Sequence, residues 1–135
     1  MNLTFPSLRC LLVAATLLGA GANAPARAAA PDTATHHRTA RMEGVDIFYR
    51  EAGARHAPAV VLLHGFPSSS HMYRDLIPAL ADRYHVIAPD YPGFGESAVP
   101  PRGHFQYTFA RFAELTDALL ARLGADRYAL YVMDY

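Results

Sequence analysis

The sequence predicts a domain of the α/β class, with helices packed on a parallel sheet. Three apolar runs of strand length, residues 59–63, 84–88 and 128–133, alternate with segments whose apolar residues recur at helical spacing. This alternation is typical of right-handed βαβ units. The chain has 135 residues, of which 52% are hydrophobic, so it has the length of one domain or part of one and enough apolar surface to fold.

The first 28 residues have the three-part pattern of a secretory signal peptide. Arg9 supplies the positive charge, residues 11–22 form the apolar stretch, and residues 26–28 are a small-x-small cleavage site. A stretch this short does not reach the roughly 20 residues that a bilayer-spanning helix needs, so no stable membrane anchor is expected. The pattern predicts a secreted or periplasmic protein that loses Cys10, its only cysteine, with the signal. A buried N-terminal helix is the alternative.

Residues 29–40 and 41–135 are expected to differ in order. The first segment is rich in Ala, Thr and His and predicts a flexible lead-in, whereas the second is expected to form the core domain. Within the core, the turn signal Glu43-Gly44 predicts a hairpin over residues 38–51 whose second strand has a mostly apolar face. The buried strand over residues 59–63 follows.

Two helical segments separate the three buried strands. Ser68 to Ser70 offer a cap for the first, which Pro78 is expected to break, with Pro78 in the first turn of a second short piece. The next helix is predicted over residues 107–123, with Gly124 at its C-cap position. Its expected buried face comprises Phe109, Phe112, Thr116, Leu119, Leu120 and Leu123.

Charge and histidine spacing exclude several classes of function. Twelve basic and twelve acidic residues balance, so neither a nucleic-acid partner nor an electrostatic membrane contact is expected. The seven histidines lack the spacing of metal ligands. Gly93 and Gly95 form a Gly-x-Gly without the third glycine and the immediate helix of a dinucleotide fingerprint. No metal or cofactor is therefore expected.

Two turns at strand ends hold the candidate functional residues. His64-Gly65-Phe66-Pro67 follows the first buried strand, and its backbone N–H groups are candidates for half of an oxyanion hole, because open α/β sheets bind ligands at the carboxyl ends of their strands. Residues 90–97, Asp-Tyr-Pro-Gly-Phe-Gly-Glu-Ser, follow the second strand. We expect this loop to pack beside the first turn, with Asp90 and Ser97 bonded to local backbone.

These two motifs, in this order and at this spacing, resemble the α/β-hydrolase fold family from about Arg41 onward. The resemblance implies a three-layer α/β/α hydrolase fold that is incomplete here: an N-terminal hairpin, the first parallel strands and two helical segments. The His-Gly-Phe-Pro turn is closer to epoxide hydrolases and related dehalogenases than to lipases. The residues implied to support the motif are His64, Gly65, Pro67, Asp90, Gly93, Gly95 and Ser97.

The resemblance also implies that Asp134 is a nucleophile, since the family places this residue after the third strand of the series. An aspartate there suits attack on an sp³ carbon and a covalent alkyl ester that water hydrolyses. The alternative is that Asp134 caps a following helix. Val132 departs from the family pattern, because glycine is usual at that position.

Phe66 and Tyr135 are then implied to lend backbone N–H groups to the oxyanion hole. Haloalkane dehalogenases usually carry asparagine and tryptophan at these places to hold the leaving halide, and a phenylalanine side chain cannot donate. Epoxides are therefore favoured over haloalkanes. His64 is expected to support the loop rather than act as the base, which the family places late in the chain.

The sequence thus predicts the N-terminal part of an exported, epoxide hydrolase-like enzyme acting on a small hydrophobic substrate. Haloalkane dehalogenase and esterase-like activities are the catalytic alternatives. A non-catalytic fragment is the other, since the family's catalytic acid and histidine come after the third strand. That strand is also expected to leave an exposed apolar edge.

Overall fold

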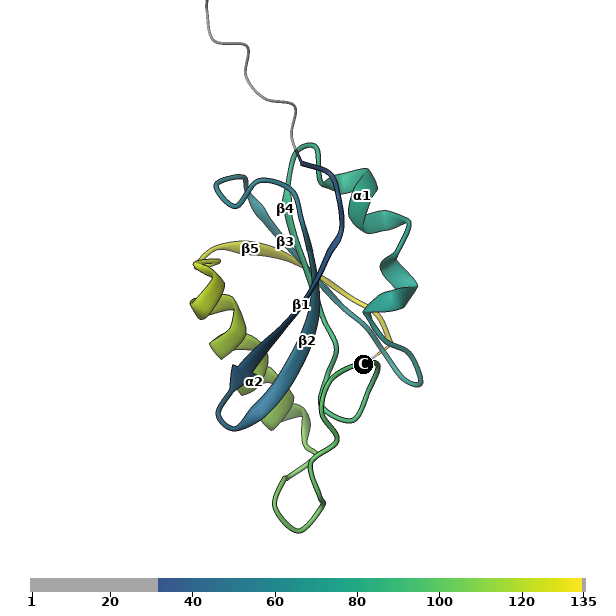
Figure 1. Ribbon diagram of the computed structural model, residues 1–135, viewed down its shortest axis with the longest axis vertical. Coiled ribbons are helices and arrows are strands. Elements are labelled where there is room, and N and C mark those ends of the chain that lie inside the picture. The colour runs from purple at the N-terminus through teal and green to yellow at the C-terminus, as the bar shows by residue number, and fades with distance from the viewer. Residues whose placement is uncertain (1–31, 135) are drawn as a thin grey trace, which may run out of the picture.

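The computed structural model describes residues 32–134, which form one five-stranded mixed sheet of order β1-β2-β4-β3-β5 (Figure 1). The elements, in chain order, are β1 (His36–Met42), β2 (Val45–Ala52), β3 (Ala59–Leu63), the 3₁₀ helix η1 (Ser70–Tyr73), α1 (Leu76–Leu80), β4 (His85–Pro89), α2 (Phe109–Leu123) and β5 (Tyr128–Val132). Strands β4, β3 and β5 are parallel, whereas β1–β2 and β2–β4 are antiparallel.

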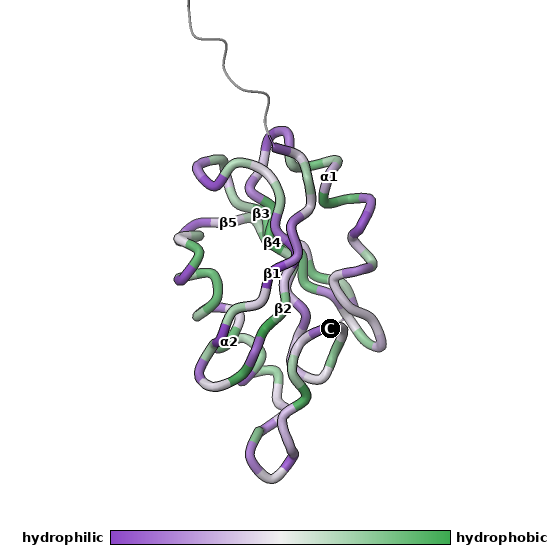
Figure 2. Tube along the Cα trace, in the orientation of Figure 1, coloured by the Kyte–Doolittle hydropathy of each residue, from purple (hydrophilic) through white to green (hydrophobic). Residues whose placement is uncertain are grey.

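Helices α1 and α2 cover opposite faces of this sheet, which confirms the three-layer arrangement (Figure 1). On the α2 face, Val61 and Ile87 pack in one cluster with Leu115 and Leu119. On the α1 face, Leu62, Val86 and Ile77 form a second cluster. Successive residues of a strand point to opposite faces, so Val61 and Leu62 reach different layers. Hydrophobic and hydrophilic segments alternate along both helices (Figure 2).

The hairpin begins earlier than the sequence predicts. His36 and His37 lie in β1 and pair with Glu51 and Arg50 of β2, so the hairpin begins two residues before its predicted start at residue 38, within the segment predicted as a lead-in. The ladder to β2 orders it despite its polar composition. The predicted turn is confirmed, with Glu43 and Gly44 both at positive φ. The signal predicted for residues 1–28 lies outside the described residues.

The predicted break at Pro78 and the predicted caps at Ser69 and Gly124 are confirmed, whereas α2 begins at Phe109, two residues after its predicted start. Ser69 caps η1 by accepting from the His71 N–H at 3.3 Å, and α1 begins anew with Pro78 in its first turn. Gly124 ends α2 in the left-handed conformation. Phe109, however, is not part of the buried face. Its side chain is 67% exposed because, one residue after the Thr108 cap, it borders a pocket at the start of the helix.

Strand β5 has the apolar sequence of a buried strand and was expected to leave an exposed apolar edge in this chain. Every residue from Tyr128 to Val132 is exposed. The strand lies at the sheet edge and pairs only with β3 within residues 32–134, which confirms the expected apolar edge. An apolar run shows what a strand would bury, but its burial also depends on neighbours on both sides.

A cluster of charged and polar side chains around the buried Glu51 joins β1, β2 and β4. Glu51 of β2 is 3% exposed, and its Oε1 lies 2.9 Å from His85 Nε2. Its Oε2 lies 2.7 Å from Arg38 Nε and 3.0 Å from an Arg55 guanidinium nitrogen. The His85 hydrogen bond, helped by Arg55, holds the pKa of Glu51 below its usual 4.5. The carboxylate is therefore the form that the folded state stabilises.

We expect this cluster to make stability depend on acidity. Because the pKa of Glu51 is lowered on folding, its contribution is complete above pH 4.5 and is lost as the pH falls through the folded-state pKa. Glu51→Gln should cost about 2 kcal/mol at neutral pH and flatten this part of the acid dependence in urea unfolding. Glu114→Gln, which removes an exposed carboxylate, is the control. An unaltered acid dependence in Glu51→Gln would contradict the assignment.

Candidate active site

The turns that follow β3 and β5 lie side by side because these strands are parallel neighbours. Leu63 pairs with Val132, and the Met133 N–H donates to the Leu63 carbonyl at 3.3 Å. Gly65, two residues after Leu63, therefore lies against Met133 and Asp134. A Cβ at Gly65 would lie 2.5 Å from the Met133 carbonyl oxygen and 3.2 Å from Asp134 Oδ2. Only glycine leaves room for this carboxylate at the end of β3.

Asp134 has a positive φ of 67°. Among residues 32–134, Glu43 in the hairpin turn is the only other non-glycine residue with a positive φ. Residues that cap a helix are usually extended, so this backbone differs from that of the N-cap alternative. A left-handed residue on a sharp turn after a strand is the geometry by which nucleophile elbows project their side chain. Strain of this kind is often found at functional sites.

Phe66 begins the exposed part of the first turn. Its side chain is 65% exposed, and its backbone N–H has no acceptor within residues 32–134. The Ser68 N–H donates to the Gly65 carbonyl at 3.0 Å, which closes the turn around Phe66, and the Phe66–Pro67 peptide is cis. An unpaired N–H on a closed turn is available to a negatively charged oxygen. Tyr135, the expected second donor, lies outside the described residues.

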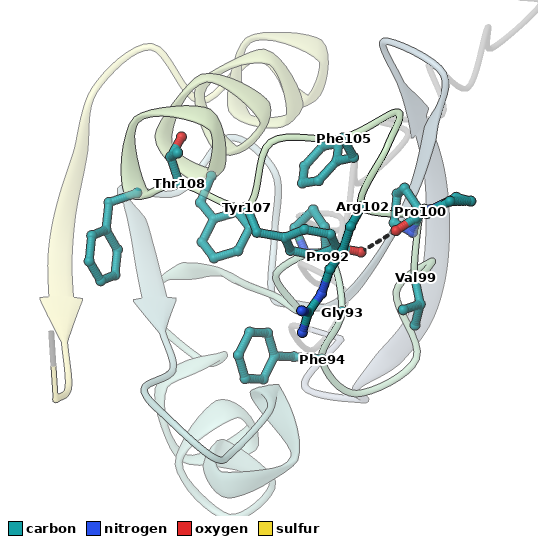
Figure 3. Close-up of a pocket in the computed structure, with 12 residues that line it drawn as sticks. Pro92, Gly93, Phe94, Val99, Pro100, Arg102, Phe105, Tyr107 and Thr108 are labelled. Atoms are coloured by element: carbon teal, nitrogen blue, oxygen red, sulfur yellow. Dashed lines mark hydrogen bonds between the residues drawn. The ribbon is translucent and has the colours of Figure 1, made fainter.

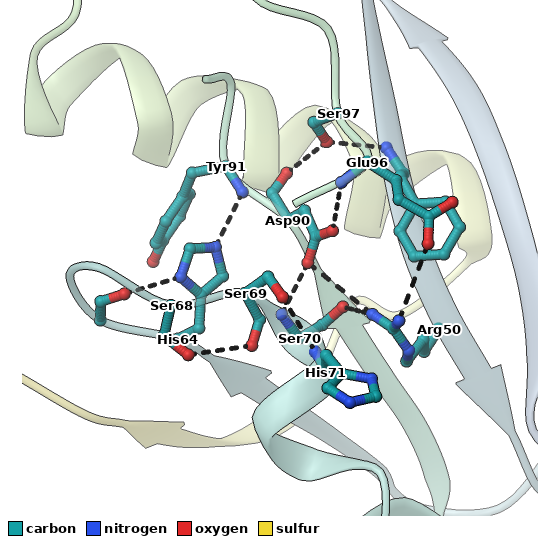
Figure 4. Close-up of polar contacts among 12 residues, drawn as sticks. Arg50, His64, Ser68, Ser69, Ser70, His71, Asp90, Tyr91, Glu96 and Ser97 are labelled. Atoms are coloured by element: carbon teal, nitrogen blue, oxygen red, sulfur yellow. Dashed lines mark hydrogen bonds and ion pairs between the residues drawn. The ribbon is translucent and has the colours of Figure 1, made fainter. Parts of the chain in front are cut away.

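His64 is fully buried, and both of its ring nitrogens bond to backbone. Nδ1 lies 2.9 Å from the Gly65 carbonyl, to which it donates, and Nε2 accepts from the Tyr91 N–H at 3.1 Å (Figure 4). Burial lowers the pKa of His64 below its usual value, so the ring is neutral at neutral pH. With both nitrogens engaged, His64 links the two turns and has no lone pair left for a substrate proton.

Asp90, at the end of β4, holds the same two turns together. The side chain is 1% exposed; Oδ1 accepts from the Ser70 N–H at 2.6 Å and Oδ2 accepts from the Glu96 N–H at 2.9 Å (Figure 4). Gly95 makes room for it, since a Cβ there would lie 1.9 Å from Oδ2. The Asp90 carboxylate thus connects the loops that follow β3 and β4 through hydrogen bonds to their backbone.

Ser97 and Gly93 shape the rest of the second loop. The Ser97 hydroxyl donates to the Asp90 carbonyl at 2.7 Å and accepts from the Phe48 N–H at 2.8 Å, which ties the loop to β2. Gly93, at φ 88°, donates its N–H to Ala98 at 2.9 Å. The expected contacts of Asp90 and Ser97 are confirmed, but they reach beyond local backbone.

Arg50 is a member of this network that the sequence did not reveal. It lies in β2 and, although charged, is only 5% exposed. Its guanidinium donates to Ser70 Oγ and lies 4.0 Å from Asp90 Oδ1 and 4.0 Å from Glu96 Oε1 (Figure 4). No signal in the sequence distinguishes this arginine from the exposed ones, because its partners come from loops distant along the chain.

The end of β3 is held from the α1 face by Tyr73. Its hydroxyl donates to the Leu63 carbonyl at 2.7 Å, and burial raises the pKa of Tyr73 to about 12. The ring also meets Tyr131 of β5 edge to face.

The described residues contain no group of three or more His, Cys, Asp or Glu side chains suited to a metal ion. They also contain no helix long and apolar enough to cross a membrane.

Comparison with known proteins agrees with this architecture. The model of the alpha/beta hydrolase fold family matches residues 58–135, and the chain belongs to this family. An uncharacterized hydrolase of Saccharomyces cerevisiae is 44% identical over 102 residues, covering 76% of this chain and 34% of the relative. A haloalkane dehalogenase of Bradyrhizobium diazoefficiens is 38% identical over 98 residues, covering 73% and 31%.

Solved structures give the same result. Epoxide hydrolase A from Mycobacterium thermoresistibile aligns with a TM-score of 0.68 at 38% identity, over 75% of this chain and 32% of that protein. The chain therefore spans about a third of the length of the relatives it matches. The residues that the family model matches, 58–135, include both motif turns and the end of β5.

Proposed function

We propose that this chain carries the nucleophile and oxyanion turns of an exported epoxide hydrolase that acts on a small hydrophobic substrate. Asp134 is the nucleophile, and the backbone N–H groups of Phe66 and Tyr135 receive the developing negative charge. The observation that carries the proposal is the contact between Asp134 and Gly65, which sets the carboxylate of a left-handed residue beside the Phe66 turn.

The proposed reaction is a nucleophilic attack by the Asp134 carboxylate on an epoxide carbon. An Asp134 oxygen attacks one epoxide carbon, and the ring C–O bond breaks with its electron pair passing to the epoxide oxygen. That oxygen takes a proton from water and becomes a hydroxyl, which leaves a hydroxyalkyl ester on Asp134. Water then hydrolyses the ester, restoring the carboxylate and releasing a diol.

A haloalkane substrate is the second candidate, since the comparisons include a haloalkane dehalogenase. One observation favours the epoxide. The Phe66 ring stands edge-on to Phe94 with centroids 6.2 Å apart, so the first turn presents hydrocarbon where a leaving halide would need a hydrogen-bond donor.

The test is formation of the ester on the 135-residue chain. After incubation with styrene oxide, we expect mass spectrometry to find one hydroxyalkyl adduct, mapped to Asp134 and released by hydroxylamine. Asp134→Asn should lower adduct formation by at least about 100-fold, because an amide oxygen is a far weaker nucleophile. This readout does not require turnover. It therefore reports on the nucleophile alone.

Asp126→Asn serves as the matched control, because this exposed carboxylate lies just before β5, at the opposite end of the strand from Asp134. Its adduct should be as abundant as that of the unaltered chain. An adduct spread over several exposed carboxylates, or one unchanged in Asp134→Asn, would refute the nucleophile assignment. Faster alkylation by a bromoalkane than by the epoxide would favour the dehalogenase.

A further inference from the structure

An open pocket of about 860 Å³ lies beside the candidate active site, between the loop that follows β4 and the start of α2 (Figure 3). Its walls come from residues 92–94, 99–102, 105, 107–109 and 112. This volume falls within the usual range for small-molecule sites, about 300–1,000 Å³. Neither Asp134 nor Phe66 lines it, so its occupant need not be the substrate proposed above.

Aromatic rings that already pack on one another form the pocket wall. The ring centroids of Phe105 and Tyr107 lie 4.7 Å apart in an edge-to-face arrangement. Tyr107 and Phe94 each stand edge-on to Phe112. The Tyr107 hydroxyl donates to the Pro100 carbonyl at 2.6 Å, which ties the two sides of the loop together. Phe105 and Phe112 are themselves buried, so the wall is anchored to the core.

Arg102 is the one charged residue among those that line the pocket. Its side chain runs across the opening, with the guanidinium toward Gly93 and Phe94 (Figure 3). No carboxylate of residues 32–134 lies within 4.0 Å of it, whereas Arg38, Arg50 and Arg111 all have acidic partners. The pocket thus combines an apolar wall with a cation that has no counter-charge within the described chain.

We propose that this pocket binds a small aromatic carboxylate, with the ring against Phe105 and Tyr107 and the carboxylate on Arg102. A guanidinium presents paired N–H donors that match a carboxylate, and aromatic side chains favour offset or edge-on contact with a ligand ring. A neutral aromatic compound would gain only the contact with the aromatic side chains. The charge of Arg102 therefore selects the ligand class.

Calorimetric titration of the 135-residue chain with 2-naphthoate and with 2-naphthylmethanol tests this inference. The carboxylate should bind more tightly than the alcohol of the same ring. Arg102→Gln should weaken naphthoate binding by about tenfold, as expected for a charge-assisted bond near the surface, and leave the alcohol unchanged. Arg127→Gln is the matched control, since that exposed arginine precedes β5 and does not line the pocket.

A second variant is designed to repel the carboxylate of the ligand without removing any existing contact. Val99 lies on the pocket wall with 74% of its side chain exposed, so Val99→Glu adds a negative charge and is not expected to disturb the core. It should weaken naphthoate binding several-fold and spare the alcohol. No binding of naphthoate, equal affinity for alcohol and carboxylate, or equal loss in Arg102→Gln and Arg127→Gln would each overturn the proposal. None of these results depends on Asp134.

Discussion

Asp90→Ala is expected to lower the free energy of unfolding by about 3–5 kcal/mol, the usual cost of removing one partner from a buried charged pair. The alanine leaves the N–H groups of Ser70 and Glu96 without their acceptors. It also leaves the buried guanidinium of Arg50 without its buried carboxylate partner. Urea unfolding followed by far-UV circular dichroism measures the loss.

Asp75→Ala controls for the removal of any aspartate. Asp75 is exposed and makes no side-chain cap bond to α1, so its loss should change stability by less than about 0.5 kcal/mol. Combining Asp90→Ala with Arg50→Met should cost less than the sum of the two single changes, because the pair shares one interaction. Additive losses, or equal effects of Asp90→Ala and Asp75→Ala, would show that the network does not hold the turns.

Gly65→Ala is expected to destabilise the chain by about 3 kcal/mol, near the upper end of the usual cost of overpacking. The new Cβ would lie 2.5 Å from the Met133 carbonyl oxygen, a backbone atom that cannot move without shifting the end of β5. The ends of β3 and β5 must separate, which carries Asp134 away from the Phe66 turn. Under the proposed function, styrene oxide labelling of Asp134 should also fall by at least about tenfold.

Gly103→Ala provides the comparison, because a Cβ there meets no atom within 4 Å and its backbone is not in the left-handed region. Its stability and labelling should match those of the unaltered chain, or its stability should rise slightly through the lower entropy of the unfolded state. If Gly65→Ala behaves like Gly103→Ala in both measurements, the contact between Gly65 and Asp134 is not required.

The candidate site shows which contacts a sequence can reveal. The two motif turns were predictable because each follows an apolar run of strand length, and parallel strands bring their carboxyl ends to one edge of the sheet. The role of Asp90 as a backbone acceptor was predictable from its place in a loop rich in turn residues. Arg50 was not, because a strand pattern records only alternation, and its partners lie 20 residues or more away.

The sequence by itself determined the order of strands and helices, their caps and breaks, and the α/β class, because these depend on periodicity and on the backbone preferences of Ser, Gly and Pro. Only the tertiary structure decided that His36 belongs to the sheet and that Phe109 borders a pocket. Those outcomes depend on which segments pack together. An apolar or polar pattern shows the environment that a residue favours. The segments packed against that residue determine whether it lies in such an environment.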